Sequence, residues 1–515
     1  MKTKFTFLVL FCATLLFAQD RIFRKVISEN KLEAKQKISK GLADTYISTT
    51  YYQQIPFNLK GDLQIELPDG KVIEAKFQKE FLYGNKSESF VYQVQNQSDA
   101  ELVFSKVDNI VTGMYLSSEG QKIIFHQTDA QTFAISIVNE GTLINKDAQE
   151  DALINKSALT GKVNDNICLA STAVCPATTI DVMVVFTPQA RTAWGGVAQS
   201  KSFITTAITN FNTALQNSGV SNVTINLVYS EEIPYVESGN ISTDLSRFRT
   251  ENDTFLDEVA GLRTAYGADL CALVTSTPTN TCGLGYLNLN PTNYSAAAAY
   301  SVGLYNCVVS NYTLAHEMGH NMGLNHDWHV NQNVNPCEHQ HGYTNKSAIT
   351  LGAASTSAQR WRTIMAYNDE CSSKGFNCTR INRWSNPGLD YNTEPTGIAI
   401  GETNPSDEAF GFARFACVVS EFMPTSTLAT TENKLAKIED FSLFPVPAKE
   451  ELNIQIKKDG KYSFRITNLV GQLVLKSDQK VINLKGLSAG SYILSVYGEG
   501  NILIGTKKSS WSNNL

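Results

Sequence analysis

Residues 313–327, TLAHEMGHNMGLNHD, constrain this chain more than any other part of its sequence. His316 and His320 are four residues apart, so on an α-helix their imidazoles project from one face and can bind the same metal ion. Glu317 would then point to the side of this pair, where a carboxylate can accept a proton from a metal-activated water without binding the metal itself. The segment therefore predicts a metal site carried by a helix.

The second half of the segment completes this site. Gly323 can adopt the left-handed backbone conformation that ends a helix, which lets the chain turn back so that His326 supplies a third nitrogen. Three neutral imidazoles leave the fourth tetrahedral position open, which is the arrangement of a catalytic Zn2+ ion and not of a structural one. A bare HExxH also occurs on ordinary surface helices, whereas HExxHxxGxxH fixes two further positions.

The extended pattern resembles the metzincin clan of zinc peptidases, in which a turn containing methionine follows the third histidine. Residues 363–367, TIMAY, are similar to that turn. The resemblance implies that Met365 forms an apolar, polarizable floor beneath the metal. Asp327, directly after the third histidine, resembles the adamalysin or reprolysin branch, and residues 383–387, RWSNP, resemble bacterial reprolysin-like enzymes.

Tyr367 has two interpretations. Its place two residues after Met365 resembles the astacins and serralysins, whose tyrosine can swing onto the zinc as a fifth ligand or transition-state stabiliser. The alternative is a tyrosine of the core or the rim of the site.

The metzincin resemblance covers residues 178–422, and we assign residues 176–423 to the peptidase domain. Runs of apolar residues predict strands at 180–187, 222–230 and 268–276, and helices at 189–217 and near 245–266. This alternation predicts an α/β (α+β) fold, and the resemblance implies a twisted mixed sheet above the active-site helix. Residues 283–288, GLGYLN, are the candidate edge strand that pairs with an extended substrate, with a plain edge hairpin as the alternative.

The chain before this domain divides in two. Residues 1–18 have two lysines, then an apolar run, and predict a signal peptide. Residues 19–175 contain short alternating runs separated by turn signals such as Pro68-Asp69-Gly70, which predict a β-rich unit with hairpins. From its place between a signal peptide and a peptidase we expect a pro-domain that keeps the enzyme latent; the alternative is a separate binding domain.

Nine cysteines follow the signal peptide, and in an exported chain they indicate disulfides: Cys168, Cys175, Cys271, Cys282, Cys307, Cys337, Cys371, Cys378 and Cys417. A bond between Cys307 and Cys417 would resemble adamalysins. Cys371 with Cys378, and Cys271 with Cys282, are candidate local loops.

Nine cysteines cannot all pair within one chain, and Cys168 is a candidate for the unpaired one. If the pro-domain is cut between Cys168 and Cys175, eight cysteines stay in the mature enzyme and Cys168 leaves with the pro-segment. Its thiolate could then hold the enzyme latent by binding the zinc. The alternative is a disulfide between Cys168 and Cys175 across a short loop.

The end of the chain has a different character. Residues 424–440 lack periodicity and predict a linker, and residues 441–515 contain short alternating runs with glycine turns that predict a small β-sandwich. The opening FSLFPVP and the run GLSAGSY resemble the C-terminal sorting domain of the type IX secretion system. The resemblance implies export across an outer membrane, by way of the periplasm of a Gram-negative bacterium. The alternative is a binding sandwich that stays in the mature enzyme.

Taken together, these patterns predict a secreted or cell-surface zinc endopeptidase, made as a latent precursor, that acts on protein or peptide substrates and contacts the secretion machinery. The competing hypothesis is a surface adhesion protein with a non-catalytic metal site; Glu317 speaks against it, because a structural zinc needs no general base. The net charge of −6 and the absence of a basic patch argue against nucleic-acid binding. No run after the signal peptide reaches the length of a transmembrane helix. Binding of Ca2+ stays open.

Overall fold

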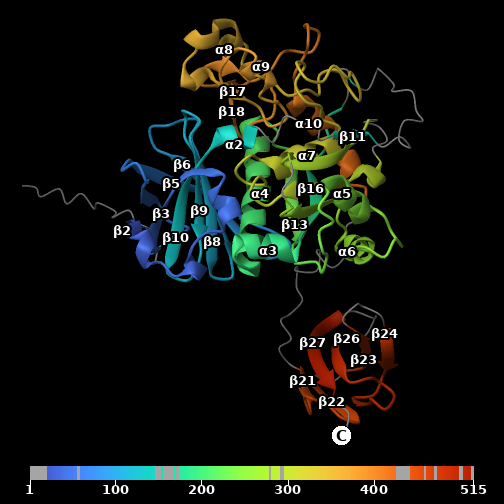
Figure 1. Cartoon of the computed structure of the whole chain (residues 1–515). Coiled ribbons are helices and arrows are strands. Elements are labelled where there is room, and N and C mark those ends of the chain that lie inside the picture. The colour runs from blue at the N-terminus through green and yellow to red at the C-terminus, as the bar shows by residue number, and fades with distance from the viewer. Residues whose placement is uncertain are drawn as a thin grey trace, which may run out of the picture. The chain divides into compact units, whose positions relative to one another are not determined.

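The structure is a computed structural model that describes residues 20–511 apart from 22, 55–57, 145–151, 155–167, 169–172, 278–279, 290–294, 425–440, 457–459, 469–472 and 498–502 (Figure 1). It forms two compact units, residues 1–426 and 427–515, which are described separately. The predicted signal peptide, residues 1–18, and nearly all of the predicted linker, residues 424–440, lie outside the described residues.

The region before the predicted peptidase domain is built mainly from strands. These are β1 (Asp20–Arg21), β2 (Phe23–Ile27), β3 (Tyr46–Gln54), β4 (Leu63–Glu66), β5 (Val72–Leu82), β6 (Glu88–Val94), β7 (Glu101–Val107), β8 (Ile110–Leu116), β9 (Lys122–Gln127), β10 (Thr132–Val138) and β11 (Ala152–Ile154), with helices α1 (Lys40–Ala43) and α2 (Glu140–Ile144). All of these strands except β11 belong to one sheet, in the order β1-β4-β5-β6-β7-β8-β9-β10-β3-β2. The predicted hairpin around Gly70 is present between β4 and β5, and Gly70 has the positive φ of 82° that this turn requires.

The predicted peptidase domain alternates strands and helices. Its strands are β12 (Thr178–Phe186), β13 (Val223–Tyr229), β14 (Leu270–Thr275), β15 (Gly283–Leu287), β16 (Tyr300–Leu304), β17 (Trp361–Arg362), β18 (Thr379–Arg380), β19 (Asp390–Tyr391) and β20 (Glu394–Pro395). Its helices are α3 (Pro188–Trp194), α4 (Val197–Asn217), α5 (Ile241–Arg249), α6 (Glu258–Tyr266), α7 (Thr313–Asn321), α8 (Lys346–Leu351), α9 (Asp369–Ser372) and α10 (Glu408–Val419).

Two predicted helices are each divided in the structure. The one expected at 189–217 is broken between α3 and α4, because Gly195 and Gly196 have φ values of 97° and 152° that interrupt helical geometry. The one expected near 245–266 is split into α5 and α6. The strands fall close to their predicted positions.

The central sheet of this domain is mixed, in the order β11-β15-β16-β14-β12-β13. Strands β13, β12, β14 and β16 run parallel, and β15 runs antiparallel to β16. The prediction that β15 is an exposed edge is wrong for the full chain. Its outer side pairs in parallel with β11, so that Ala152 lies opposite Gly285 and Ile154 opposite Leu287.

Helix α4 lies between the two sheets of this unit (Figure 1). Nearly every side chain from Gln199 to Leu215 is buried. Its apolar residues, such as Ile204 and Phe211, join the large core beneath the mixed sheet. Its hydroxyl-bearing residues face the ten-stranded sheet, where the Thr112 hydroxyl lies 2.9 Å from the hydroxyls of Ser202 and Thr206.

The disulfides correct several predictions. Cys371 is bonded to Cys378 as predicted. The other bonds join Cys168 to Cys337, Cys175 to Cys417, and Cys282 to Cys307, while Cys271 is buried and unbonded. The expected Cys307–Cys417 and Cys271–Cys282 pairs are therefore wrong.

Cys168 is neither a latency thiol nor the partner of Cys175. Its sulfur is bonded to Cys337, 169 residues away, and so offers no thiolate to a metal ion. Pairing requires Cα atoms about 4.4–6.8 Å apart. The fold brings Cys168 and Cys337 to 5.6 Å, a proximity that sequence spacing does not contain.

The C-terminal unit contains β21 (Phe441–Phe444), β22 (Glu451–Ile456), β23 (Ser463–Asn468), β24 (Leu473–Ser477), β25 (Val481–Asn483), β26 (Gly490–Tyr497) and β27 (Leu503–Trp511). They form a three-stranded sheet, β21-β22-β25, and a four-stranded sheet, β24-β23-β26-β27. Apolar residues of both sheets, including Leu452, Phe464 and Leu494, share one buried cluster. Among the described residues of the whole chain, no helix is both long and apolar enough to cross a membrane.

A buried histidine on β9 makes the stability of the first unit depend on pH. His126 packs edge-on against Phe203 of α4, with ring centroids 4.8 Å apart, and burial lowers its pKa to about 4. An unfolded histidine titrates near pH 6.5. The folded state therefore binds fewer protons than the unfolded state. The contribution of neutral, buried His126 to the free energy of unfolding is complete above pH 6.5 and is lost as the pH falls towards 4.

We expect the full chain to lose about 2 kcal/mol more unfolding free energy between pH 7 and pH 5 than its His126→Phe variant, since 1.5 pH units below the unfolded pKa correspond to about that energy. Urea unfolding at both pH values measures the difference. Replacement of the exposed His329 by Phe serves as the control. Equal losses in wild type and His126→Phe would contradict the prediction.

Candidate metal centre

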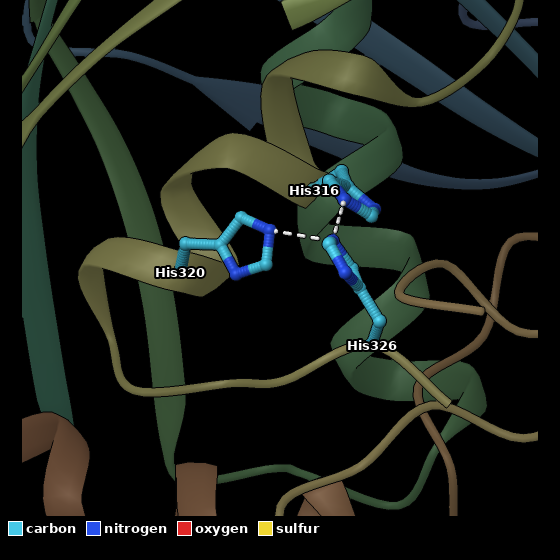
Figure 2. Close-up of side chains that lie close together, drawn as sticks. All are labelled: His316, His320 and His326. Atoms are coloured by element: carbon cyan, nitrogen blue, oxygen red, sulfur yellow. Dashed lines mark hydrogen bonds between the residues drawn. The ribbon is translucent and has the colours of Figure 1, made fainter. Parts of the chain in front are cut away.

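Helix α7 carries the first two predicted ligands. It begins after Tyr312, which has a left-handed conformation with φ of 56°, and ends where Gly323 takes a φ of 87°. His316 and His320 lie one turn apart on this helix, and the chain turns back after Gly323 as predicted. His326 then faces the other two rings from the following loop (Figure 2).

The three imidazoles converge on one point. The Nε2 atom of His326 lies 3.3 Å from Nε2 of His316 and 3.0 Å from Nε2 of His320. All three rings are buried. Within the part of the chain that the structure describes, this is the one group of histidine, cysteine and acidic side chains close enough to hold a metal ion.

Backbone carbonyls determine which ring nitrogen faces this point. Nδ1 of His316 lies 2.8 Å from the carbonyl oxygen of Ile364, and Nδ1 of His320 lies 2.7 Å from that of Leu324. A carbonyl oxygen can only accept a hydrogen bond, so each Nδ1 carries the proton and donates it. Each Nε2 is then left with its lone pair, which is the form that binds a metal.

Met365 packs against Gly319, which lies between His316 and His320 on helix α7. A Cβ atom at Gly319 of α7 would come within 2.9 Å of the Met365 sulfur, so this glycine lets the turn pack directly against the helix. Gly342 plays the same part on the other side, because a Cβ there would lie 2.5 Å from the backbone nitrogen of Ala366.

Asp327 joins the third histidine to this turn. Its carboxylate accepts hydrogen bonds from the backbone N–H groups of Tyr367, at 2.8 Å, and His329, at 3.0 Å. Burial raises the pKa of Asp327, while these two bonds oppose that shift. The Tyr367 ring centroid lies 4.1 Å from that of His326, so the residue is buried against a ligand ring.

Glu317 is buried between α7 and β15. Gly283 and Gly285 of that strand approach it closely, because a Cβ atom at Gly283 would lie 2.3 Å from Oε1 of Glu317, and one at Gly285 would lie 2.8 Å from its carbonyl oxygen. Two glycines in a five-residue strand therefore make room for the carboxylate. A glycine inside a strand often marks such an approach, and this signal was present in the sequence.

The donor set fits a zinc ion. Three neutral imidazole nitrogens are a borderline-soft set, and their ligand atoms lie within 4.8 Å of one another. Nothing in the set selects a hard ion such as Mg2+ or Ca2+, which prefer oxygen ligands.

Comparison with known proteins agrees with this geometry. Residues 177–385 match the family described as Metallo-peptidase family M12, and residues 442–508 match the Secretion system C-terminal sorting domain. A Peptidyl-Asp metalloendopeptidase of Stenotrophomonas maltophilia (strain R551-3) is 36% identical over 241 residues, which are 47% of this chain and 53% of the relative. One from Pseudomonas fragi is 31% identical over 175 residues, 34% of this chain and 83% of the relative. The chain belongs to metallopeptidase family M12.

The similarity covers only part of this chain and of its relatives. The chain spans about half the length of the Stenotrophomonas relative, and of a Xanthomonas campestris pv. campestris one, 36% identical over 44% of this chain and 48% of the relative. The M12 match ends before α10 and begins after β11. It therefore includes all three histidines and Glu317, and it leaves out the ten-stranded sheet.

Several residues of the M12 site had no signal in the sequence. The carbonyls of Ile364 and Leu324 act through the backbone, so their side chains reveal nothing. The pairing of β11 with β15 joins segments more than 100 residues apart, and no local pattern encodes it.

We expect His320→Ala to abolish zinc binding by the full chain, because two imidazoles alone cannot hold a tetrahedral site with an open position. The matched control is His329→Ala, an exposed histidine outside the cluster that should keep one zinc per chain. Metal analysis after dialysis measures both. Retention of stoichiometric zinc by His320→Ala would show that the metal is bound elsewhere.

Proposed function

We propose that this M12 protein is a secreted zinc endopeptidase, made as a latent precursor. The observation that carries the proposal is the convergence of the three buried histidines, with the carboxylate of Glu317 buried on the same helix as two of them. A structural zinc site would be closed by a fourth protein ligand, and among the described residues the cluster contains three.

Each residue of the site has a separate role in the proposed peptide hydrolysis. A zinc ion bound there would supply Lewis acidity that polarises the scissile carbonyl and makes water a stronger acid. Glu317 accepts the proton of the attacking water and delivers it to the leaving amine. The carbonyls of Ile364 and Leu324 hold the ligand rings in orientation, and Tyr367 packs against His326, where its hydroxyl could stabilise the developing oxyanion.

The names of the relatives suggest a substrate class. Each of those compared is called a peptidyl-Asp metalloendopeptidase. We propose that this chain also cleaves peptide bonds beside aspartate.

We expect Glu317→Gln to keep its zinc and to lose at least about a thousandfold in peptide hydrolysis, because the ligands are untouched and the proton acceptor is gone. Metal analysis and a fluorogenic peptide assay of the processed protein provide the two readouts. Wild-type hydrolysis by a fully zinc-loaded Glu317→Gln protein would reject the mechanism. Absence of zinc-dependent hydrolysis by the processed wild type would favour the alternative of an adhesion protein with a non-catalytic metal.

Latency is supported by the position of β11. This strand belongs to the region that precedes the M12 match, and it pairs with the outer edge of β15. The same strand β15 packs against Glu317 through Gly283 and Gly285. An extended substrate that bound this edge by adding a strand would need the position that β11 occupies.

The contact between the ten-stranded sheet and α4 also suits a removable pro-domain. Part of it is apolar, since Met114 and Ile124 share a core cluster with α4. The rest includes hydroxyl groups: Thr209 donates to Ser89 at 2.7 Å, and Ser202 donates to the Ser105 carbonyl at 2.9 Å. Serine and threonine can exchange such bonds for bonds to water. The hydroxyl groups of α4 would therefore stay hydrogen-bonded to water after the sheet leaves.

We expect Leu153→Asp to give an intact precursor at least about tenfold more active than wild type, because an acidic side chain at the centre of β11 weakens its packing beside β15. Leu153→Val, which keeps an apolar strand-forming residue, is the matched control. Peptide hydrolysis is measured together with mass spectrometry, so that cleaved chains are not counted. A wild-type precursor as active as the processed enzyme would overturn latency itself.

The C-terminal match supports the proposed export. A domain of the sorting family implies use of the corresponding secretion system, so residues 442–508 would contact that machinery and the enzyme would act outside the cell or on its surface. We propose a route through the periplasm of a Gram-negative cell.

A further inference from the structure

Two buried arginines lie side by side next to the metal centre. Arg362 of β17 and Arg380 of β18 are direct partners in a short parallel pair. Their guanidinium groups converge, since Nη1 of Arg362 and Nη2 of Arg380 donate to the same carbonyl oxygen, that of Ala366, at 2.5 and 3.2 Å. Both side chains are almost completely buried.

The arginine pair is connected to the site from two directions. Ala366 stands between Met365, which packs against Gly319 of α7, and Tyr367, whose ring contacts that of His326. Arg380 also donates to the carbonyl of Asn311, directly before α7, at 3.2 Å. The two cations therefore line the junction between the Met-turn and the start of the active-site helix.

In the full chain the N-terminal sheet covers this junction. Lys122 of β9 places its ammonium 4.9 Å from the ring centroid of Tyr312, the residue before α7, and forms a 2.6 Å ion pair with Glu140 of α2. The Lys122 side chain is completely buried there. Nearby, Leu116 at the end of β8 packs in one cluster with Trp361 and Ile381, the neighbours of the two arginines.

The side chains at this junction carry mostly positive charge, which attracts a carboxylate. Burial lowers the pKa of Lys122 to about 8; Glu140 opposes this shift, and the positive charges of Arg362 and Arg380 add to it. Three cations thus share a low-dielectric region with the carboxylate of Glu140. Both Lys122 and Glu140 precede the M12 match and also Cys168, which is bonded to Cys337. A cut between Glu140 and Cys168 would therefore remove one cation and that carboxylate and leave the arginine pair.

We propose that Arg362 and Arg380 form the pocket that binds the acidic side chain of the substrate, and that the Lys122–Glu140 ion pair covers this pocket in the precursor. The inference rests on the proposed endopeptidase function and deepens it. Planar guanidinium groups are suited to a carboxylate, because two parallel N–H donors match its two oxygens. The pocket would hold the aspartate at a position flanking the scissile bond.

The test compares matched peptides that differ only in Asp, Asn or Ala beside one scissile bond, cleaved by the full chain after activation by limited proteolysis. We expect wild type to prefer Asp over Asn by about ten- to a hundredfold in kcat/KM, the range for a hydrogen bond to a charged group. Arg362→Gln and Arg380→Gln should each reduce this ratio by at least about tenfold, because glutamine has neither the positive charge nor the planar fork of donors. Arg360→Gln, which removes a half-buried cation of the same segment that stacks on Phe376, should leave the ratio unchanged.

The outcomes separate the pocket from the enzyme. No zinc-dependent cleavage of any peptide by wild type rejects the endopeptidase function. Cleavage of Asp and Asn peptides at equal rates rejects the acidic pocket, and an unchanged ratio in folded, zinc-loaded glutamine variants rejects these arginines as its residues. Where a glutamine variant does not fold, Arg362→Lys and Arg380→Lys keep the charge and lose the planar fork. An unchanged Asp to Asn ratio in both lysine variants would likewise overturn the proposal.

Discussion

Two backbone carbonyls, those of Ile364 and Leu324, decide that Nε2 of His316 and His320 is the nitrogen free to bind a metal. Each carbonyl must stand within hydrogen-bond reach of a buried ring, so the loops that carry them cannot move independently of α7. Asp327 adds a third restraint by bonding the backbone of Tyr367. The Met-turn, the helix and the third-histidine loop are in this way parts of one rigid arrangement, and catalytic geometry of this kind has to be in place before substrate arrives.

Strand β15 serves two requirements that meet at one place. Its glycines allow the backbone to approach Glu317, and its outer side offers a sheet edge. An unpaired strand edge beside a carboxylate can bind an extended peptide by strand addition, but it can also pair with strands of other molecules. In the full chain β11 pairs with this edge, so a three-residue strand protects it from unwanted pairing and would also provide the latency proposed above.

The sequence was sufficient for whatever depends on local spacing. The helix at α7, the turn at Gly323 and the strands of the mixed sheet follow from periodicity and turn chemistry, and the Cys371–Cys378 loop follows from nearness in the chain. The expectation for Met365 came from the resemblance to metzincins. Contacts between distant segments did not follow. Three contacts depend on how whole elements pack, and no local sequence pattern predicts them. These are the Cys168–Cys337 bond, the β11–β15 pairing and the convergence of Arg362 with Arg380. The break between α3 and α4 is the exception, since Gly195-Gly196 was a visible signal against a continuous helix.

The bond between Cys175 and Cys417 closes residues 175–417, which include nearly all of the predicted peptidase domain, into a covalent ring. The endopeptidase activity proposed for this chain would expose it to cleavage by other copies of itself. The segment between α5 and α6 carries Asp253 and the exposed Asp257 inside this ring. Surface loops of this type are where nicks occur first. A ring that is cut once is still a single molecule, so the zinc ligands and the sheet that supports them would remain joined after self-inflicted damage that would divide an open chain in two.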